Sequence, residues 1–530
     1  MKSKSVALIV GHIGLPLLVG CSNAGSLNPP ATITLNECRI DGVDTAVKCA
    51  KLEVFENRAL KSGRKIALNI VVLPASARIK EPDPIFLFAG GPGQAASDLI
   101  PAAQRILGGL TSKRDIVFVD QRGTGKSNLL NCKFPSEDDP AMADPASRRA
   151  MTLKVFSECR DILSKNADLT QYGTTTAMAD YDDVRAALGY NQINLWGASY
   201  GTRSAQEYLR RYPDRVRTMV IDGVASTSMA LPATFARDAS AVLESAFIAC
   251  EQSSLCKKNY PTLREDFSNL LARLAKKPQT ISMVDPLNGL ARPITVSRET
   301  VSMLVFSALY IPQLVSVLPE VIKQAASNEF APLFALVGGF MEFADDKIAM
   351  GMRMSVNCNE DVPRIDATTR ANAAKVAPFG DTFIREFSTA CEVWPKGKVA
   401  ADFFTPVLSD KPVLILSGRL DPVTPPSFGD EVKKTFSNSV HFVAPMAGHG
   451  VSHLGCGPKL IKQFIEKASV AGLNGDCLNR LPRPTFYQAM EKKSGKIAEA
   501  AKGLAIIAIE SNDMTNQKNS ATPTIAGEKK

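Results

Sequence analysis

The sequence predicts an α/β fold, in which a doubly wound, mostly parallel sheet carries an inserted helical segment. Between residues 66 and 225, short apolar runs alternate with helix-like stretches, as in a parallel sheet with crossover helices. From about residue 226 to 400 the apolar spacing is that of helices. Strand-like runs return at 412–417 and 440–444, which indicates that the helical segment interrupts a single sheet.

Five strands are expected in the first half of the sheet. They are residues 66–73, 85–88, 115–119, 192–196 and 216–221. Each run is short and mainly apolar, which is typical of strands that helices bury on both faces. In the inserted segment, helical spacing is clearest at 231–250, 263–275 and 301–325. With 45% hydrophobic and 22% charged residues, the chain has the composition of a globular protein.

These patterns divide the chain into five parts. Residues 1–20 are expected to be an export signal, 21–225 and 401–480 the two parts of the sheet domain, 226–400 a helical cap, and 481–530 a C-terminal extension. From about residue 511 the tail is rich in Asn, Thr, Lys and Ser, so part of the extension is expected to be disordered.

Ser199 is the most informative residue, because it lies in Gly197-Ala198-Ser199-Tyr200-Gly201 between a predicted strand and a predicted helix. In such a G-x-S-x-G elbow the serine occupies a sharp, strained turn, and the flanking glycines allow it. The turn holds the hydroxyl above the sheet, at the N-terminus of a helix whose dipole favours negative charge. Ser199 is therefore the candidate nucleophile.

A serine nucleophile needs a base and an acid, and the chain has 4 histidines. His449 follows a predicted strand in a G-H-G loop that could reach the carboxyl edge of the sheet, so it is the candidate base. His453 is the rival base, and His441, inside the predicted strand, is expected to be structural. Asp421 follows the strand-like run 412–417 and is the candidate acid, because a rigidly held carboxylate can orient an imidazole.

A glycine-rich loop, Ala89-Gly90-Gly91-Pro92-Gly93, follows the predicted strand 85–88. Such a loop can turn backbone N–H groups toward a developing oxyanion, and the amide after the nucleophile completes the hole. We therefore expect the backbone N–H groups of Gly91 and Tyr200 to donate hydrogen bonds to the oxyanion. A pyrophosphate site in this loop is disfavoured because Pro92 removes a donor, and a P-loop ending at Ser127 lacks its first glycine.

Five motifs in order along the chain carry a specific resemblance. They are G-G-P-G at 90–93, D-Q-R-G-x-G-x-S at 120–127, W-G-x-S-Y-G-T at 196–202, G-x-x-D-P-V-T-P at 418–425 and G-H-G at 448–450. From about residue 66 to 480 the chain resembles the proline iminopeptidase and tripeptidyl aminopeptidase family of serine exopeptidases. The resemblance implies an α/β-hydrolase fold with a helical cap, and removal of residues or short peptides from free N-termini. Many prolyl members carry histidine where this chain has Ala89, which favours the tripeptidyl branch.

A free N-terminus carries an ammonium group, and a carboxylate is its natural partner in a partly dehydrated pocket. Glu360 and Asp361 lie late in the cap-like region, beside Cys358. The resemblance makes them the candidates, since many tripeptidyl aminopeptidases carry a similar Cys-x-x-Asp element here. A solvated acidic turn is the alternative interpretation.

The N-terminus predicts export. Lys2 and Lys4 precede an apolar stretch, residues 6–19, that is too short and too interrupted to span a membrane. Residues 18–21, Leu-Val-Gly-Cys, resemble a bacterial lipoprotein cleavage site, which implies a lipid on Cys21. Because Ser22 and not aspartate follows, we expect an outer-membrane anchor that faces the periplasm. The alternative is an ordinary cleaved signal with a soluble product.

Cysteine usage independently favours export. Of the 11 cysteines, an even number remains once Cys21 is set aside, as suits disulfides in an oxidising compartment. The sequence does not determine their connectivity. Pairing in chain order gives plausible short loops between Cys38 and Cys49, Cys132 and Cys159, Cys250 and Cys256, Cys358 and Cys391, and Cys456 and Cys477.

The function expected from the sequence is an exported serine aminopeptidase that works through an acyl-enzyme. Its expected partners are peptides with free N-termini and, through the lipid, a membrane; no metal or organic cofactor is required. An esterase or lipase on the same triad, or a binding protein that keeps the fold without turnover, is the alternative. A formal net charge of +9 is small for this length, and the basic residues are interspersed with acidic ones, so nucleic-acid binding is not expected.

Overall fold

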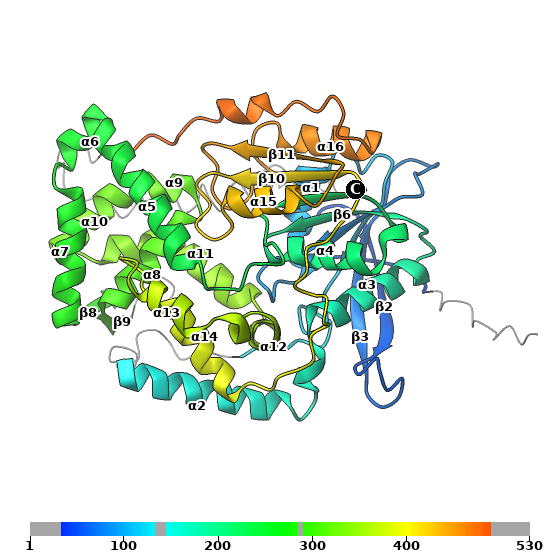
Figure 1. The fold of residues 1–530 in the computed structure, drawn as a ribbon, viewed down its shortest axis with the longest axis horizontal. Coiled ribbons are helices and arrows are strands. Elements are labelled where there is room, and N and C mark those ends of the chain that lie inside the picture. The colour runs from blue at the N-terminus through cyan, green and yellow to red at the C-terminus, as the bar shows by residue number, and fades with distance from the viewer. Residues whose placement is uncertain (1–32, 133–144, 285–289, 489–530) are drawn as a thin grey trace, which may run out of the picture.

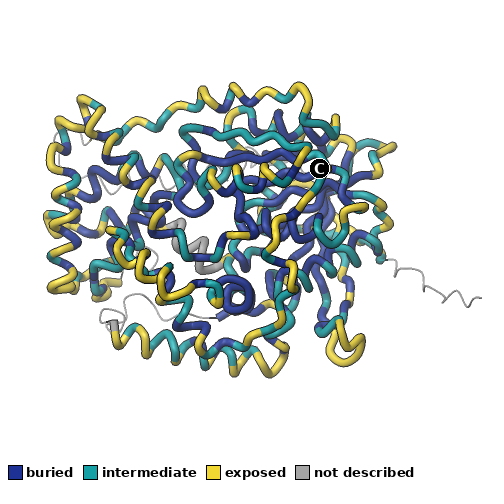
Figure 2. The backbone as a smooth tube through the Cα atoms, viewed as in Figure 1, coloured by how far each residue is buried: buried dark blue, intermediate teal, exposed yellow. Residues whose placement is uncertain are grey.

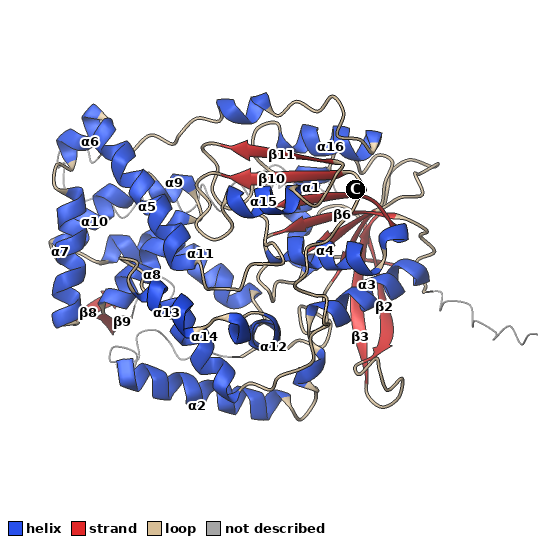
Figure 3. Cartoon of the chain, viewed as in Figure 1, coloured by secondary structure: helices blue, strands red, loops and turns tan. Residues whose placement is uncertain are grey.

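The computed structural model describes residues 33–132, 145–284 and 290–488 (Figure 1). The predicted export signal, Cys21 and nearly all of the C-terminal extension lie outside these residues. One large sheet occupies one side of the molecule, and a group of helices occupies the other (Figure 3). Within the described ranges, no helix is both long and apolar enough to cross a bilayer.

The large sheet has nine strands, and the strand that leads to Ser199 lies inside it. In spatial order the strands are β1 (Asn36–Cys38), β2 (Val47–Phe55), β3 (Lys65–Leu73), β5 (Ile116–Val119), β4 (Ile85–Phe88), β6 (Ile193–Ala198), β7 (Val216–Asp222), β10 (Val413–Gly418) and β11 (Ser439–Ala444). From β5 to β11 in this order all neighbours are parallel. Their carboxyl ends therefore meet at one edge, where ligands bind in open α/β sheets.

The prediction of a mostly parallel sheet is confirmed, and each predicted strand is present. The sequence analysis missed β1 and β2, which extend the sheet in antiparallel pairing. In β2, buried and solvated side chains are mixed, so it lacks the continuous apolar run that marked the inner strands.

Helices cover both faces of the parallel strands, which makes the sheet doubly wound. Side chains of β10 alternate between two apolar cores, with Val413 and Ile415 in one and Leu414 and Leu416 in the other. The first core is covered by α3 (Thr174–Ala187), α4 (Tyr200–Arg211) and α15 (Pro426–Lys433), and the second by α1 (Ile100–Leu107) and α16 (Gly457–Lys467). Figure 2 shows buried backbone gathered in the interior of the molecule, with exposed backbone at its periphery.

Between β7 and β10 the chain forms a helical insertion, residues 223–412, much of it packed around an apolar core of its own. Its elements are α5 (Phe235–Gln252), α6 (Ser254–Asn259), α7 (Leu263–Lys276), β8 (Gln279–Val284), β9 (Ala291–Val296), α8 (Arg298–Leu309), α9 (Pro312–Val315), α10 (Leu318–Ala326), α11 (Ala331–Lys347), α12 (Met350–Glu360), α13 (Ala367–Ala374) and α14 (Thr382–Val393). From outside the insertion, α2 (Pro145–Leu163) packs against α14 (Figure 1). The boundaries of a separate cap, 226–400, stay a prediction.

Two features of the insertion differ from the sequence prediction. The helical pattern at 301–325 is divided among α8, α9 and α10, because Pro312 and Pro319 each stand in the first turn of a new helix. The segment also contains the antiparallel pair β8 and β9, which the sequence analysis did not foresee. No residue of β8 is fully buried, so its sequence carries little apolar signal.

Among the described residues, five disulfides join the cysteines in chain order, which is the pairing that the sequence analysis gave as plausible. They are Cys38–Cys49, Cys132–Cys159, Cys250–Cys256, Cys358–Cys391 and Cys456–Cys477. The bridge between Cys358 and Cys391 ties α12 to α14. This cysteine usage is typical of proteins that fold in an oxidising environment.

Candidate active site

Ser199 occupies a strained turn between β6 and α4. Its backbone has φ 55° and ψ −128°, in the left-handed half of conformational space that non-glycine residues rarely enter. Because α4 begins at the next residue, Ser199 is the residue that caps the helix N-terminus. This is the conformation that the G-x-S-x-G pattern predicts for a nucleophile elbow.

The two glycines of the elbow are required by close packing. A Cβ at Gly201 would lie 2.0 Å from the carbonyl oxygen of Phe88 at the end of β4. A Cβ at Gly197 would lie 2.5 Å from the carbonyl oxygen of Gly201 itself. The turn can therefore bring α4 against β4 only when both positions lack a side chain.

His449 and Asp421 form the hydrogen bond expected of a base and its orienting acid. The Nδ1 atom of His449 lies 2.8 Å from Oδ2 of Asp421. Asp421 is fully buried, and its carboxylate also accepts hydrogen bonds from the amides of Val423 and Thr424 and from the Thr424 hydroxyl. Although burial alone would raise it, these donors and His449 hold the pKa of Asp421 below its usual range.

The imidazole is held from a second side by Tyr310, which the sequence analysis did not name. The amide of His449 donates to the carbonyl of Tyr310 at 3.1 Å, and the two rings meet edge to face at 5.3 Å between centroids. Burial lowers the pKa of His449, but the nearby Asp421 outweighs burial and leaves the pKa raised. The imidazolium form is thus stabilised, as a general base requires.

Asp222, the last residue of β7, joins the nucleophile to the histidine loop. Its carbonyl accepts a hydrogen bond from the amide of Ser199 at 3.0 Å. Its carboxylate accepts from the amides of Val451 and Ser452, just beyond His449. In addition, a Cβ at the next residue, Gly223, would lie 3.3 Å from Cε1 of His449. The elbow and the imidazole therefore lie on either side of the end of β7.

The other histidines of the described chain do not share this setting. His453 is exposed, and it forms no hydrogen bond to a carboxylate within the described ranges. His441 bridges Asp430 and Ser417 at 2.9 Å each, which repeats the residue types of a catalytic triad. Ser417 is fully buried, and a Cβ at Gly429 would lie 2.7 Å from the His441 ring. Substrate cannot reach that serine, so this second arrangement is structural, as expected for His441.

The glycine loop after β4 lies directly against the elbow. A Cβ at Gly90 would lie 3.2 Å from Cβ of Ser199, and Gly91 has φ 107°, which favours glycine. Tyr200 is the first residue of α4, so its N–H has no carbonyl one helical turn before it to bond to. These positions agree with an oxyanion hole, and the roles of Gly91 and Tyr200 stay predictions.

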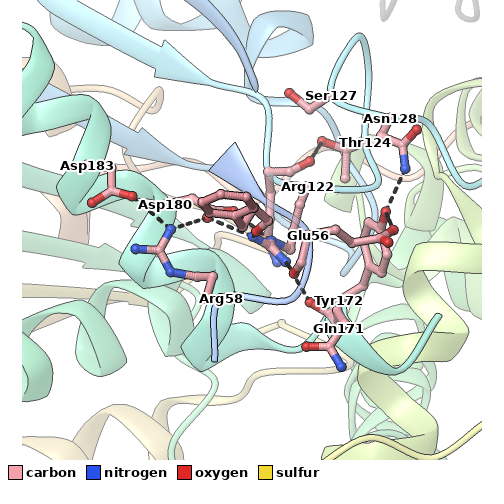
Figure 4. A network of polar contacts seen from close by, with 12 residues as sticks. Glu56, Arg58, Arg122, Thr124, Ser127, Asn128, Gln171, Tyr172, Asp180 and Asp183 are labelled. Carbon is pink, nitrogen blue, oxygen red and sulfur yellow. Dashed lines mark hydrogen bonds and ion pairs between the residues drawn. The ribbon is translucent and has the colours of Figure 1, made fainter. Parts of the chain in front are cut away.

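The D-Q-R-G motif forms hydrogen bonds to segments next to the glycine loop and to Tyr200 of the elbow. The Asp120 carboxylate accepts hydrogen bonds from the amides of Ser97 and Lys126, and Gln121 donates to the Tyr200 hydroxyl. Figure 4 shows the buried Arg122 guanidinium paired with both oxygens of Asp180, at 2.6 and 2.8 Å, and also bonded to backbone carbonyls. The sequence analysis used this segment as a family motif and weighed it as a P-loop, but did not foresee that its charged residues hold backbone groups in place.

Glu360 and Asp361 lie behind the elbow helix, and both are buried. Asp361 pairs with the buried Arg203 of α4, at 2.8 Å between Oδ1 and Nη1. Glu360 accepts hydrogen bonds from the amide and hydroxyl of Thr174, whose hydroxyl also bonds to Tyr200. Burial raises the pKa of Glu360 to about 7. The charge of Asp361 is thus already balanced by a cation, and ammonium binding by either residue stays a prediction.

Sequence reasoning missed several residues of the site, namely Asp222, Tyr310 and Thr424. Thr424 stands in the D-P-V-T-P motif, and its hydroxyl lies 3.1 Å from Nδ1 of His449, so that motif carried a signal. Asp222 and Tyr310 lie in no motif, and their roles depend on contacts with residues more than a hundred positions away.

Two known families match separate parts of this chain. The family described as alpha/beta hydrolase fold matches residues 83–277, and the family described as TAP-like protein matches residues 374–477. The serine protease Hip1 of Mycobacterium tuberculosis (strain ATCC 25618 / H37Rv) is 25% identical over 429 residues, which cover 74% of this chain and 79% of that protein. A tripeptidyl aminopeptidase of Streptomyces coelicolor is 26% identical over 221 residues, covering 39% of this chain and 41% of that protein.

A solved esterase from Exiguobacterium antarcticum is 15% identical, and the alignment covers 76% of this chain and 94% of that chain. Its TM-score is only 0.33. The first matched range contains the glycine loop and the elbow, and the second contains Asp421 and His449. The chain therefore has the α/β-hydrolase fold, and its sequence is similar to those of tripeptidyl aminopeptidases and proline iminopeptidases.

Proposed function

We propose that this protein is an exported serine peptidase that releases a short unit from the free N-terminus of peptides. The observation that carries the proposal is the 2.8 Å bond between His449 and Asp421, held beside the strained Ser199 by the end of β7. The relatives named as a serine protease and as a tripeptidyl aminopeptidase support peptide substrates. Ala89 before the glycine loop favours a tripeptidyl over a prolyl unit.

The proposed mechanism uses three side chains. Ser199 Oγ attacks the peptide carbonyl carbon while Nε2 of His449 takes the hydroxyl proton. Asp421 stays ionised, holds the imidazole by its Nδ1–H and stabilises the imidazolium. The backbone N–H groups of Gly91 and Tyr200 bind the oxyanion.

Collapse of the tetrahedral intermediate breaks the C–N bond, and His449 gives its proton to the leaving amine. The N-terminal unit is then held as an ester on Ser199. A water molecule, deprotonated by His449, attacks this ester and releases the unit as a carboxylic acid, which regenerates the serine.

Export and anchoring belong to the same proposal. The five disulfides favour an oxidising compartment, and Cys21 is the proposed lipid attachment site. With radiolabelled palmitate, cells that produce the protein should label it, and Cys21→Ala should remove both the label and the protein from the membrane fraction. If the unmutated protein carries no label, the N-terminus is an ordinary cleaved signal and Cys21 is not lipidated.

A panel of substrates tests the proposed activity. Tripeptidyl and single-aminoacyl amides with free N-termini, the same compounds N-acetylated, and acyl esters of matched size are compared by kcat/KM, with Ser199→Ala as the blank. We expect the free-amino tripeptidyl amide to give the highest value, and its acetylated form to lose most of it. Equal rates on blocked and free substrates would overturn the aminopeptidase proposal, and turnover of the esters alone would make the protein an esterase.

Recognition of the ammonium group is tested by Glu360→Gln and Asp361→Asn, measured separately. If Glu360 binds the ammonium, its neutralisation should lower kcat/KM for free-amino substrates and leave acetylated ones nearly unchanged. Asp361→Asn is the comparison, because Arg203 already balances that carboxylate. A loss in Glu360→Gln that is equal for free and acetylated substrates would assign the residue a structural role.

A further inference from the structure

The side chain of Gln94, the residue that follows the glycine loop, lies beside Ser199. A Cβ at Gly90 would lie 3.2 Å from Cβ of Ser199 and 3.6 Å from Oε1 of Gln94. Both atoms are therefore within 4 Å of one point, and the Ala198 carbonyl oxygen, 3.4 Å from that point, shows that it faces the elbow. Gln94 is partly exposed, so its amide is not enclosed in an apolar core.

The backbone of Gln94 is held from two sides. Its amide donates to the carbonyl of Gly90 at 3.3 Å, which closes the glycine loop. On the other side, Gln94 forms an antiparallel bridge with Ile348 of the insertion. Beside this bridge, the amide of Ala349 donates to the carbonyl of Gly93 at 2.9 Å. Because these contacts fasten the loop to the start of α12, the side chain of Gln94 projects from a fixed position.

This position is close to the place where negative charge develops during acyl transfer. The carbonyl carbon that Ser199 attacks becomes bonded to its Oγ, so the oxyanion forms near Cβ of Ser199. The terminal amide of glutamine carries two N–H donors, and side-chain amides are among the groups that form oxyanion holes. Oε1 is the atom of Gln94 next to Gly90, and a half-turn of the terminal amide presents Nε2 in its place.

We propose that the side-chain amide of Gln94 donates a hydrogen bond to the oxyanion at Ser199, in addition to the backbone donors Gly91 and Tyr200. The inference rests on the proposed role of Ser199 as the nucleophile. A neutral donor stabilises the developing charge and brings no charge of its own that would have to be desolvated. The proton stays on Nε2 throughout, so proton transfer remains between Ser199, His449 and the leaving group.

Two substitutions of Gln94 separate hydrogen-bond donation from packing. Gln94→Met keeps the length of the side chain without a polar group, and Gln94→Glu keeps its shape but, when ionised, has no N–H. We expect both to lower kcat on p-nitrophenyl butyrate by about a hundredfold with little change in KM, because the bond forms in the transition state. Native kcat in either variant, or an effect on KM alone, would overturn the proposal.

Gln104→Met is the matched control. Gln104 lies in α1, is partly exposed like Gln94, and donates to the hydroxyl of Thr45 at 2.7 Å. Its substitution should change neither kcat nor KM. Urea unfolding of the Gln94 variants should give the native midpoint, which shows that a loss of kcat does not come from a loss of folded protein.

A boronic acid measures the same hydrogen bond without turnover. n-Butylboronic acid forms a tetrahedral anionic adduct with the serine hydroxyl, so it imitates the intermediate. In Gln94→Met its inhibition constant should rise by about the factor by which kcat/KM falls, about a hundredfold. An inhibition constant that stays native while kcat falls would show that Gln94 does not contact the oxyanion, and would overturn the proposal.

A peptide substrate separates this proposal from the peptidase proposal. The ester and the boronic acid require only the nucleophile, whereas a tripeptidyl amide requires the proposed peptidase. If both Gln94 variants lose ester turnover but the unmutated protein cleaves no tripeptidyl amide, the peptidase proposal fails and the role of Gln94 stands. If Gln94→Met cleaves the amide and the ester at native rates, the role of Gln94 fails and the peptidase proposal stands.

Discussion

A buried ion pair holds the elbow helix in place. Arg203 and Asp361 balance each other behind the elbow helix, and Arg203 also donates to the carbonyl of Met229, so the pair fastens α4 to the insertion. Removing one member of such a buried pair leaves the other charge without a partner, which is costly.

This pair predicts a large effect of removing Arg203. Arg203→Met should lower the free energy of unfolding by about 3–5 kcal/mol, because it leaves the carboxylate of Asp361 buried without a cation. Arg385→Met, which removes an exposed arginine paired with Asp381, is the comparison and should change the free energy of unfolding by less than about 1 kcal/mol. Urea unfolding of both variants measures this, and equal losses would contradict a structural role of the buried pair.

Glu360 predicts a dependence of stability on pH. Its pKa in the folded protein is raised to about 7 from 4.5, so between these values the folded state holds a proton that the unfolded state has released. The stabilisation is complete below pH 4.5 and is lost as the pH rises to about 7. Glu360→Gln, which imitates the protonated group, should lose less stability than the native protein between pH 5 and pH 8 in urea unfolding. Parallel losses would contradict the raised pKa.

The candidate catalytic residues could be named from the sequence because each stands in a local motif. Ser199 lies in the elbow and Asp421 and His449 follow strand-like runs, and the structure joins Asp421 to His449 at 2.8 Å. Asp222 and Tyr310 stand in no motif. Their importance comes from contacts between distant segments, which no pattern along the chain encodes.

At the scale of elements, the sequence signal was strongest where strands are buried on both faces. The inner strands, such as β4 and β10, are fully buried and read as apolar runs. Outer strands such as β2 and the small β8–β9 pair are partly solvated, so their composition resembles that of loops. Prolines divided the predicted helix 301–325 into separate helices. A proline has no N–H to donate within a helix, so it interrupts the helical hydrogen bonds, whereas the first turn of a new helix tolerates it.

The contact between α4 and β4 is predicted to depend on Gly201. Gly201→Ala would place a Cβ 2.0 Å from the carbonyl oxygen of Phe88, so α4 must move and carry the elbow away from the glycine loop. We expect a loss of stability and a large loss of labelling by a fluorophosphonate. Gly338→Ala is the control: its Cβ meets no atom within 4 Å, and it should stabilise the exposed helix by about 0.5–1 kcal/mol. Full labelling of Gly201→Ala would contradict the close packing.

At the scale of the whole molecule, two disulfides can be compared: one joins helices of the insertion, and the other joins two strands at the edge of the sheet. Cys358–Cys391 ties α12, which meets the glycine loop and carries Glu360, to α14. Cys38–Cys49 ties β1 to β2 at the antiparallel edge of the sheet. The chain-order pairing was one possibility that the sequence allowed, and the sequence could not select it because connectivity depends on the folded positions.

Removing these two bridges should separate stability from activity. Cys358→Ala with Cys391→Ala, and Cys38→Ala with Cys49→Ala, should each lower the free energy of unfolding by about 2–4 kcal/mol. Only the first pair should also lower kcat/KM, because α12 positions groups at the glycine loop. Thermal unfolding and kinetics on one tripeptidyl amide measure both effects, and equal activity in the two double variants would show that α12 is held without the bridge.

Fluorophosphonate labelling with mass spectrometry tests the catalytic assignment most directly. The account predicts one adduct, on Ser199, that is absent from Ser199→Ala, nearly absent from His449→Ala and retained in His453→Ala, because His449 is the histidine bonded to Asp421. An adduct on another residue, or labelling that survives His449→Ala and is lost in His453→Ala, would contradict it.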